Sequence, residues 1–175
     1  MLCVIAKLPE SAAEKLDGLR KAVVPDAAAK APLYGHITLA TYLGNEEEWF
    51  IRSCRESLTG FPAFEIEYDQ LGVLEASSIV VALPQLSEQL ASLHRRLTEG
   101  FESDLDNWTR DETWVPHTTL FYGPGSDLQG ICRSMESLFT PFRAVVNTIE
   151  FSRVLEAGFE ILGRMDLPLI PPQKG

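Results

Sequence analysis

The chain has 175 residues, of which 45% are hydrophobic and 23% charged, and its formal net charge is −10. This length and composition are typical of one soluble globular domain with a hydrophobic core. The acidic balance excludes a protein that binds an extended nucleic-acid duplex, which needs a basic surface, but it is compatible with a pocket for one small or terminal phosphate.

In chain order, the apolar pattern predicts alternating strands and helices. In the first half we expect a strand at Leu2–Leu8, a helix at Ser11–Val23, a loop at Pro25–Pro32, a strand at Gly35–Ala40, a helix at Glu46–Leu58, and strands at Phe64–Leu74 and Ser78–Leu83. In the second half we expect a helix at Leu86–Phe101, a loop at Glu102–Glu112, a strand at Thr113–Tyr122, a helix at Asp127–Phe139, strands at Phe142–Leu155 and Glu160–Asp166, and a proline-rich tail at Pro168–Gly175.

The two halves follow the same order, which is helix, strand, helix and two strands, with one extra strand leading the first half. This order indicates an internal duplication. No linker separates the halves, so we expect residues 1–175 to form a single domain in which two pseudo-symmetric lobes share one core.

The chain has no apolar run near the roughly eighteen residues of a membrane span, so we expect no membrane partner. Its first residues, Met1 to Pro9, carry no basic leader and suit a strand better than a signal peptide. The three scattered cysteines indicate neither a disulfide framework nor a zinc cluster. These features predict a cytoplasmic protein. In the absence of a clear signal for assembly, we expect a monomer.

Two of the three histidines occur in the same pattern, His-x-Thr-Leu. The units begin at His36 and His117, and their threonines are Thr38 and Thr119. Residues two positions apart in a strand point to the same face, so the His and Thr of each unit are expected to lie together. One such unit alone is more simply explained as a core His beside a β-branched strand residue. Its repetition in equivalent strands favours a paired site.

Two histidines and two threonines suit the cleavage of a phosphodiester. An imidazole titrates near neutral pH, so one His can act as the general base while the other acts as the general acid. Each Thr hydroxyl can donate to a non-bridging phosphate oxygen, and two such donors stabilise charge that develops in the transition state. The scheme needs no metal, and the motifs supply no third metal ligand.

The paired motif resembles that of the 2H phosphoesterases, which include the bacterial RNA 2′,3′-cyclic phosphodiesterases, also called 2′-5′ RNA ligases. The family hallmark is two His-x-Thr/Ser-x units in which x is mostly apolar, and only Thr118 departs from it here. The opening Val4–Glu10 is similar to the family's first strand and proline turn, and Pro116 is similar to the proline that often precedes its second motif. The resemblance spans almost the whole chain.

This resemblance implies an α+β, bilobal, duplicated fold in which two antiparallel sheets face a central groove, with helices on the outside. His36 and His117 would meet in the groove as the acid–base pair, with the two roles unassigned, and Thr38 and Thr119 would bind phosphate. The implied activity, without a cofactor, is hydrolysis or reversible ligation at a 2′,3′-cyclic or 2′-5′ phosphodiester. The implied substrates are RNA ends or small nucleotides.

Some bacterial members carry a basic residue shortly after the second motif, where this chain has Phe121 and Tyr122. This departure and the acidic balance favour a substrate that is smaller than an RNA end or is contacted differently. Tyr34, Tyr42 and Phe121 continue the face of the His and Thr side chains if the strands are regular, so we expect them to contact the substrate. An aromatic ring can stack on a base, although packing at the groove edge also explains these residues.

Two other functions fit the same residues. The groove of a non-catalytic module could bind a nucleotide or phosphate without turning it over. A scaffold could use the fold for contacts with partner proteins, but such contacts give no reason for both motifs to lie together.

Overall fold

The computed structural model describes residues 1–156 and 158–169. Ala157 and residues 170–175, which belong to the predicted tail, lie outside the described residues. Within the described part of the chain, no helix is long and apolar enough to cross a membrane.

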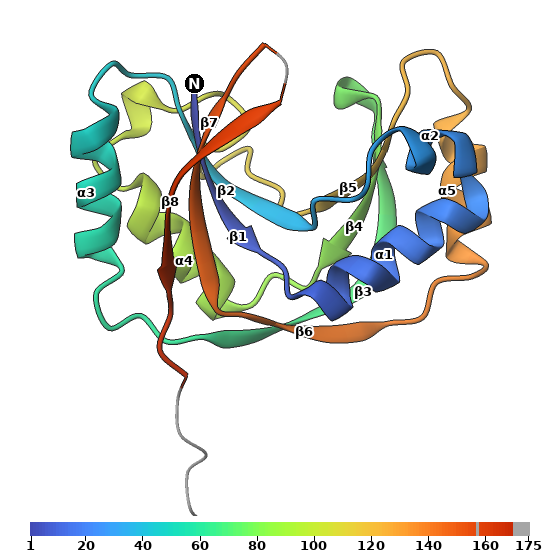
Figure 1. The fold of residues 1–175 in the computed structure, drawn as a ribbon, viewed down its shortest axis with the longest axis horizontal. Coiled ribbons are helices and arrows are strands. Elements are labelled where there is room, and N and C mark those ends of the chain that lie inside the picture. Colours follow the sequence, from blue (N-terminus) through green and yellow to red (C-terminus); the bar gives the residue numbers. More distant parts are fainter. Residues whose placement is uncertain (157, 170–175) are drawn as a thin grey trace, which may run out of the picture.

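Two antiparallel sheets of four strands each form the centre of the molecule (Figure 1). The first sheet has the order β2-β1-β7-β8, formed by His36–Tyr42, Leu2–Lys7, Thr148–Val154 and Phe159–Asp166. The second sheet has the order β5-β4-β3-β6, formed by Thr118–Tyr122, Ile79–Pro84, Phe64–Leu74 and Phe142–Val146.

The helices cover the outer sides of the two sheets (Figure 1). They are α1 (Glu10–Val23), α2 (Pro25–Lys30), α3 (Glu47–Ser57), α4 (Glu88–Thr98) and α5 (Leu128–Glu136). The first sheet is covered by α3 and α4, and the second by α1, α2 and α5. The predicted α+β fold, with two antiparallel sheets and helices outside, is therefore confirmed.

Two of these helices pack on the sheet of the other half of the chain. Helix α1 follows β1 of the first sheet but contacts β5 of the second. Helix α4 follows β4 of the second sheet but contacts β2 of the first. The repeated order is thus β1-α1-β2-α3 and β4-α4-β5-α5, which begins one strand earlier than the sequence indicated, and β3 and β7 take equivalent places in the two sheets, beside β4 and β1.

The apolar faces of both sheets and of the helices form one contiguous buried cluster. Its largest fully buried side chains include Tyr68 from the second sheet, Phe151 from the first and Phe50 from α3. Complete burial of one such side chain contributes about 1.5–3 kcal/mol. This shared core supports both strands that carry the His-x-Thr units.

Those two strands, β2 and β5, are edge strands of their sheets and contact each other in the middle of the molecule (Figure 1). The hydroxyl of Thr118 on β5 donates to the backbone carbonyl oxygen of His36 on β2, over 2.9 Å. The line along which the two sheets meet is therefore also the line that brings the two motifs together.

Three predicted elements differ from the structure. The predicted loop at Pro25–Pro32 contains α2, because Pro suits the first position of a helix and the three alanines after Asp26 favour its continuation. The predicted strand at Thr113–Tyr122 begins only at Thr118, since Trp114 N–H bonds to the carbonyl of Arg110 in a turn and Pro116 has no N–H to pair.

The predicted strand at Phe142–Leu155 is two strands that belong to different sheets. Strand β6 ends at Val146 and pairs with β3 of the second sheet, whereas β7 begins at Thr148 and pairs with β1 of the first. The chain crosses between the sheets at Asn147. A continuous apolar pattern carries no local signal for this crossing.

Candidate active site

The first motif strand, β2, contains a bulge directly after its Thr. Along β1 the pairing residues are consecutive, Ile5 and Val4, whereas their partners on β2 are Thr38 and Ala40. Leu39 is therefore an extra residue in the ladder. One extra residue reverses the face on which the following side chains lie.

Regular alternation would place Tyr42 on the same face of β2 as His36. Because of the bulge, Tyr42 lies on the opposite face. The structure places Tyr42 in the core, with 3% of its surface exposed and its ring stacked on Phe50 at a centroid distance of 4.3 Å. Thr41 takes the place on the groove face, where it lines a cavity with Thr38. Tyr42 is therefore not on the groove face, contrary to the expectation from the sequence.

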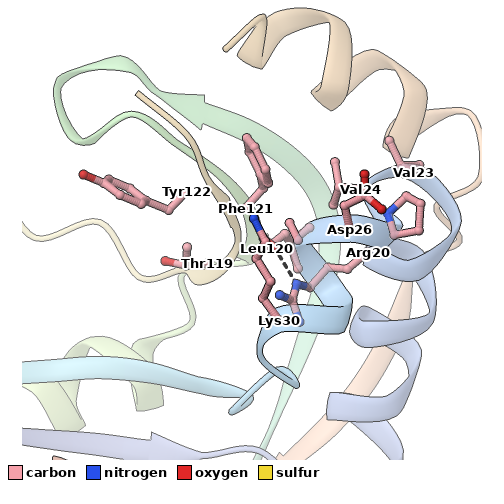
Figure 2. Close-up of a pocket in the computed structure, with 11 residues that line it drawn as sticks. Arg20, Val23, Val24, Asp26, Lys30, Thr119, Leu120, Phe121 and Tyr122 are labelled. Atoms are coloured by element: carbon pink, nitrogen blue, oxygen red, sulfur yellow. Dashed lines mark hydrogen bonds between the residues drawn. The ribbon is translucent and has the colours of Figure 1, made fainter. Parts of the chain in front are cut away.

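The second motif strand, β5, has its bulge at the equivalent position. Consecutive residues of β4 pair with Thr119 and Phe121, so Leu120 is the extra residue. Phe121 consequently lies on the face opposite Thr119 and packs against the core. The exposed Tyr122 returns to the face of Thr119, and Figure 2 shows these two side chains extending from the same side of the strand.

Both bulge carbonyls are held by buried basic side chains. His94 on α4 donates from Nδ1 to the Leu39 carbonyl oxygen over 2.8 Å, and its ring stacks on Trp114 at 3.8 Å. Arg20 on α1 donates from Nε to the Leu120 carbonyl oxygen over 2.7 Å. A buried carbonyl that leaves the ladder needs another donor. Each bulge is therefore a fixed feature of its strand.

The two motif histidines are oriented in the same way. His36 Nδ1 lies 2.6 Å from the carbonyl oxygen of Tyr34, and His117 Nδ1 lies 2.7 Å from that of Val115. A carbonyl oxygen can only accept, so each Nδ1 carries the hydrogen. In both neutral rings the lone pair is then on Nε2, the atom that is available for proton transfer.

Burial lowers the pKa of both histidines below the ordinary value of 6.5. The hydrogen bonds to Tyr34 and Val115 oppose this effect by raising the pKa of each ring. The positive charges of Lys7 and of protonated His117 also lower the pKa of His36, whereas the negative charge of Glu150 raises it. Both rings are therefore mainly neutral at pH 7 in the free protein.

A polar cluster on the first sheet lies next to His36. The Tyr34 ring is 6.0 Å from the His36 ring, and its hydroxyl donates to Glu150 Oε1 over 2.6 Å. Glu150 is fully buried, and Arg164 donates to its other oxygen over 2.8 Å. Tyr34 therefore lies beside His36, and its hydroxyl is already bonded to Glu150.

A cavity of about 450 Å³ lies between the two sheets. Thr38 of the first motif and His117 of the second both line it, although they are far apart in the sequence. Thr119 lines a second cavity, of about 690 Å³, which is bordered by α1 and α2 and holds Phe121 (Figure 2). The structure thus brings Thr38 and His117 to one cavity, whereas Thr119 lines the other and His36 lines neither of the two.

The buried Thr118 connects the two motifs through its hydroxyl. The hydroxyl donates to the His36 carbonyl oxygen, so it accepts the hydrogen bond from the Tyr68 hydroxyl, 2.7 Å away. Burial raises the pKa of Tyr68 well above its ordinary value, which keeps this hydroxyl protonated and able to donate. The one polar residue at an otherwise apolar motif position therefore has a structural role.

We expect Thr118→Val to lower the free energy of unfolding by about 1–3 kcal/mol, because it leaves the His36 carbonyl and the Tyr68 hydroxyl without their partner. Urea unfolding at neutral pH measures this loss. Thr118→Ser keeps the hydroxyl and is expected to retain most of the stability. Equal losses in the two variants would assign the effect to methyl packing and not to the hydrogen bond.

Among the described residues, no group of three or more His, Cys, Asp and Glu side chains is placed to hold a metal ion. Arg153, a basic residue near the end of β7, bonds to Glu47 and Glu160 in surface ion pairs. The positive charges on the groove face of the first sheet come instead from Lys7 and Arg164, on β1 and β8.

Comparisons with known proteins identify a family and similar solved structures. The family model of the 2′-5′ RNA ligase superfamily matches residues 8–157. No curated protein was found to match the chain in sequence. Among solved structures, E. coli LigT in complex with NADP+ is similar with a TM-score of 0.65 and 19% identity, over 95% of this chain and 96% of that chain.

Two further solved structures are similar over the same extent. E. coli LigT in complex with 3′-AMP has a TM-score of 0.64 and 19% identity, over 95% of this chain and 97% of that chain. A structure described as a phosphoesterase has a TM-score of 0.67 and 20% identity, again over 95% and 97%. At these identities the likeness demonstrates a common fold.

Proposed function

The chain belongs to the 2′-5′ RNA ligase superfamily, and from this premise we propose that it is a metal-independent phosphoesterase for a 2′,3′-cyclic or 2′-5′ phosphodiester of a small nucleotide or an RNA end. The observation that carries the proposal is the equivalent arrangement of the two motifs. In each, the His ring is held through Nδ1 by a carbonyl two residues earlier and the Thr follows two residues later, and Thr38 and His117 line one cavity.

His36 and His117 would share the proton transfers of the reaction. With a cyclic phosphate, a water molecule attacks phosphorus while Nε2 of one neutral ring removes its proton. The Nε2–H of the other ring, in its protonated form, donates to the leaving ribose oxygen as its bond to phosphorus breaks. When the 5′-hydroxyl of a second nucleotide attacks phosphorus in place of water, the same two proton transfers form a 2′-5′ phosphodiester as the bond to the ribose 3′ oxygen breaks, so the same residues would serve hydrolysis and ligation.

The hydroxyls of Thr38 and Thr119 would donate to the non-bridging oxygens of the phosphate. These oxygens gain negative charge as the fifth ligand approaches phosphorus, so the two hydrogen bonds are stronger in the transition state than in the bound substrate. The bulge directly after each Thr, with its carbonyl held by His94 or Arg20, supports the fixed position that this role requires.

Hydrolysis of 2′,3′-cyclic mononucleotides in the presence of EDTA tests the proposal. We expect turnover to a nucleoside monophosphate, with a rate that the chelator does not change. Calorimetry with product analysis covers the alternative of a binding module: heat of binding with no product would refute the proposed activity. A rate that EDTA abolishes and a divalent cation restores would refute metal independence.

The pH dependence follows from the lowered pKa values of His36 and His117. The value of kcat/KM reports the free enzyme, which needs one neutral and one protonated ring. As pH rises, the acid loses its proton at a pKa below 6.5, so kcat/KM should decrease above that pH. As pH falls, the base becomes protonated, so kcat/KM should decrease again.

We therefore expect a bell-shaped profile of kcat/KM with its maximum below pH 6.5. The alkaline limb of kcat should lie at a higher pH, because the negative charge of the bound phosphodiester stabilises the imidazolium. Initial rates between about pH 4.5 and about pH 8.5 measure both limbs. A kcat/KM maximum on the alkaline side of neutrality would contradict the assignment of the acid and base roles to two histidines with lowered pKa values.

A further inference from the structure

We infer that the cavity beside His117 is a nucleobase site and that Trp108 is the residue on which the base stacks. This inference rests on the proposed function, since it names the part of the substrate that lies next to the reacting phosphate. The cavity supports this inference because Thr38, His117 and Trp108 all line it.

Trp108 is unusually exposed for a residue of its type. Tryptophan is highly buried on average in folded proteins, whereas 59% of the Trp108 surface is accessible. An indole ring is a large flat platform on which any base can stack. An exposed indole on the rim of a cavity that also holds phosphate-site residues suits recognition of a nucleotide.

The segment that carries Trp108 is attached to the strand of the first motif. Leu43 N–H donates to the Asp104 carbonyl oxygen over 2.7 Å, and Asp106 N–H donates to the Thr41 carbonyl oxygen over 3.0 Å. These bonds add residues 104–106 to the free edge of β2. The position of the Trp108 segment relative to Thr38 is therefore set by backbone pairing.

A side-chain network then fixes the turn from Asp106 to Thr109. One carboxylate oxygen of Asp106 accepts from the N–H of Trp108 over 3.0 Å and from the N–H and hydroxyl of Thr109 over 2.9 and 2.8 Å. The oxygen of the Thr109 hydroxyl accepts from Thr41 N–H over 3.0 Å, and Thr109 is 3% exposed. The backbone of Trp108 is thus ordered before a ligand binds, which reduces the entropy cost of stacking.

Another part of the cavity wall comes from the second sheet. It consists of apolar residues at the end of the β3–β4 hairpin, chiefly Leu74, Ala76 and Ile79. Ser78 closes this hairpin in the left-handed region at φ 54°, with its N–H bonded to the Glu75 carbonyl oxygen. A base that stacks on Trp108 would therefore lie in a cavity whose wall also includes apolar side chains of the second sheet.

The charges of the cavity favour a base over a second phosphate. Its described lining includes two carboxylates, Asp106 and Glu75, and no lysine or arginine. An additional phosphate would be repelled there, whereas a neutral base with exocyclic amino groups can donate to carboxylate or Thr oxygens. The volume of about 450 Å³ lies within the range of pockets for small ligands.

The test compares two substrates that share the vicinal cyclic phosphate. One is 2′,3′-cyclic AMP, and the other is glycerol 1,2-cyclic phosphate, which has no base. We expect Trp108→Ala to lower the ratio of kcat/KM for the nucleotide to kcat/KM for the base-free ester by about 5- to 150-fold, the range known for loss of one stacked base. Trp108→Phe should retain most of the ratio.

The matched control is Trp49→Phe, because Trp49 is also exposed but lies on α3, where it packs against Phe101. It should leave the ratio at its original value. If Trp108→Ala leaves the ratio unchanged while both esters are hydrolysed, the base site is wrong and the phosphoesterase proposal stands.

If neither ester is hydrolysed, the proposed function fails, and a fluorescence titration with 3′-AMP then decides the base site independently. Stacking on Trp108 should quench tryptophan emission, and this quenching should be lost in Trp108→Phe but kept in Trp49→Phe. No quenching, or quenching that survives in Trp108→Phe, would overturn the inference.

Discussion

Replacement of either His36 or His117 by alanine is expected to lower kcat for the hydrolysis of a 2′,3′-cyclic nucleotide by about 10²- to 10⁴-fold. Each variant removes the Nε2 atom that would accept or donate a proton, while the other ring remains. Because the two rings act on the same transition state, the double variant should be only slightly slower than the slower single variant. Initial rates with 2′,3′-cyclic AMP, compared under single-turnover conditions, measure these losses.

The folded state should survive both substitutions. Each ring makes one hydrogen bond through Nδ1 to a carbonyl two residues earlier, and loss of such a bond costs about 0.5–1.5 kcal/mol. Thermal unfolding and binding of 3′-AMP identify any variant that has lost its structure and not its chemistry. Wild-type rates in both alanine variants would rule out the acid–base assignment.

Replacement of Thr38 or Thr119 by valine is expected to lower kcat by about 10²- to 10³-fold, the effect of one lost donor to a developing oxyanion. Valine keeps the branched shape and the strand preference of threonine, so the hydroxyl is the main group removed. The loss should be larger in kcat than in KM, since the hydrogen bond strengthens as the transition state forms. Steady-state kinetics on the cyclic nucleotide separates the two parameters.

The serine variants of the same two residues are the controls, because Thr38→Ser and Thr119→Ser keep a hydroxyl at the same place. They should remain within about tenfold of the wild type, which corresponds to about 1.4 kcal/mol. A serine variant as slow as the valine variant would show that the methyl group, and not the donor, supports the rate. A rise in KM at constant kcat would assign the Thr to ordinary binding of the substrate.

Much of the fold could be predicted because the pattern of apolar residues determines most of the elements. The strands at β1, β3, β4 and β8 and the helices α1 and α3 to α5 lie within a few residues of their predicted ranges. The missed helix α2 had a usable signal, since Pro25 and Asp26 are followed by three alanines. The His-x-Thr pairs were visible because the two residues of each pair lie two positions apart in the sequence.

The bulges at Leu39 and Leu120 could not be predicted from the sequence. Leucine suits a regular strand as well as a bulge, and the donors that hold the two carbonyls, His94 and Arg20, are distant in the chain. The prediction therefore assumed that side chains alternate regularly between the two faces beyond the bulge in each strand. For this reason Tyr42 was expected in the groove, and Tyr122 was not recognised on the face of Thr119.

Interactions between distant segments gave no sequence signal for the same reason. The buried Glu150 that binds Tyr34 and Arg164 lies in a strand with an ordinary apolar pattern. The turn that contains Trp108 is held by the carboxylate of Asp106. The sequence does not indicate this role of Asp106, because it depends on the pairing of residues 104–106 with β2. Such features need the topology before their chemistry can be recognised.

The exchange of helices between the halves makes the molecule equivalent to a domain-swapped dimer fused into one polypeptide. Arg20, which lies close to the first motif in the sequence, serves the second, and His94, which lies close to the second, serves the first. A substitution in α1 therefore acts on the His117 strand and one in α4 on the His36 strand. Each half therefore supplies one of the side chains that hold the motif strand of the other half, so we expect neither half to keep its motif strand in this conformation when expressed alone.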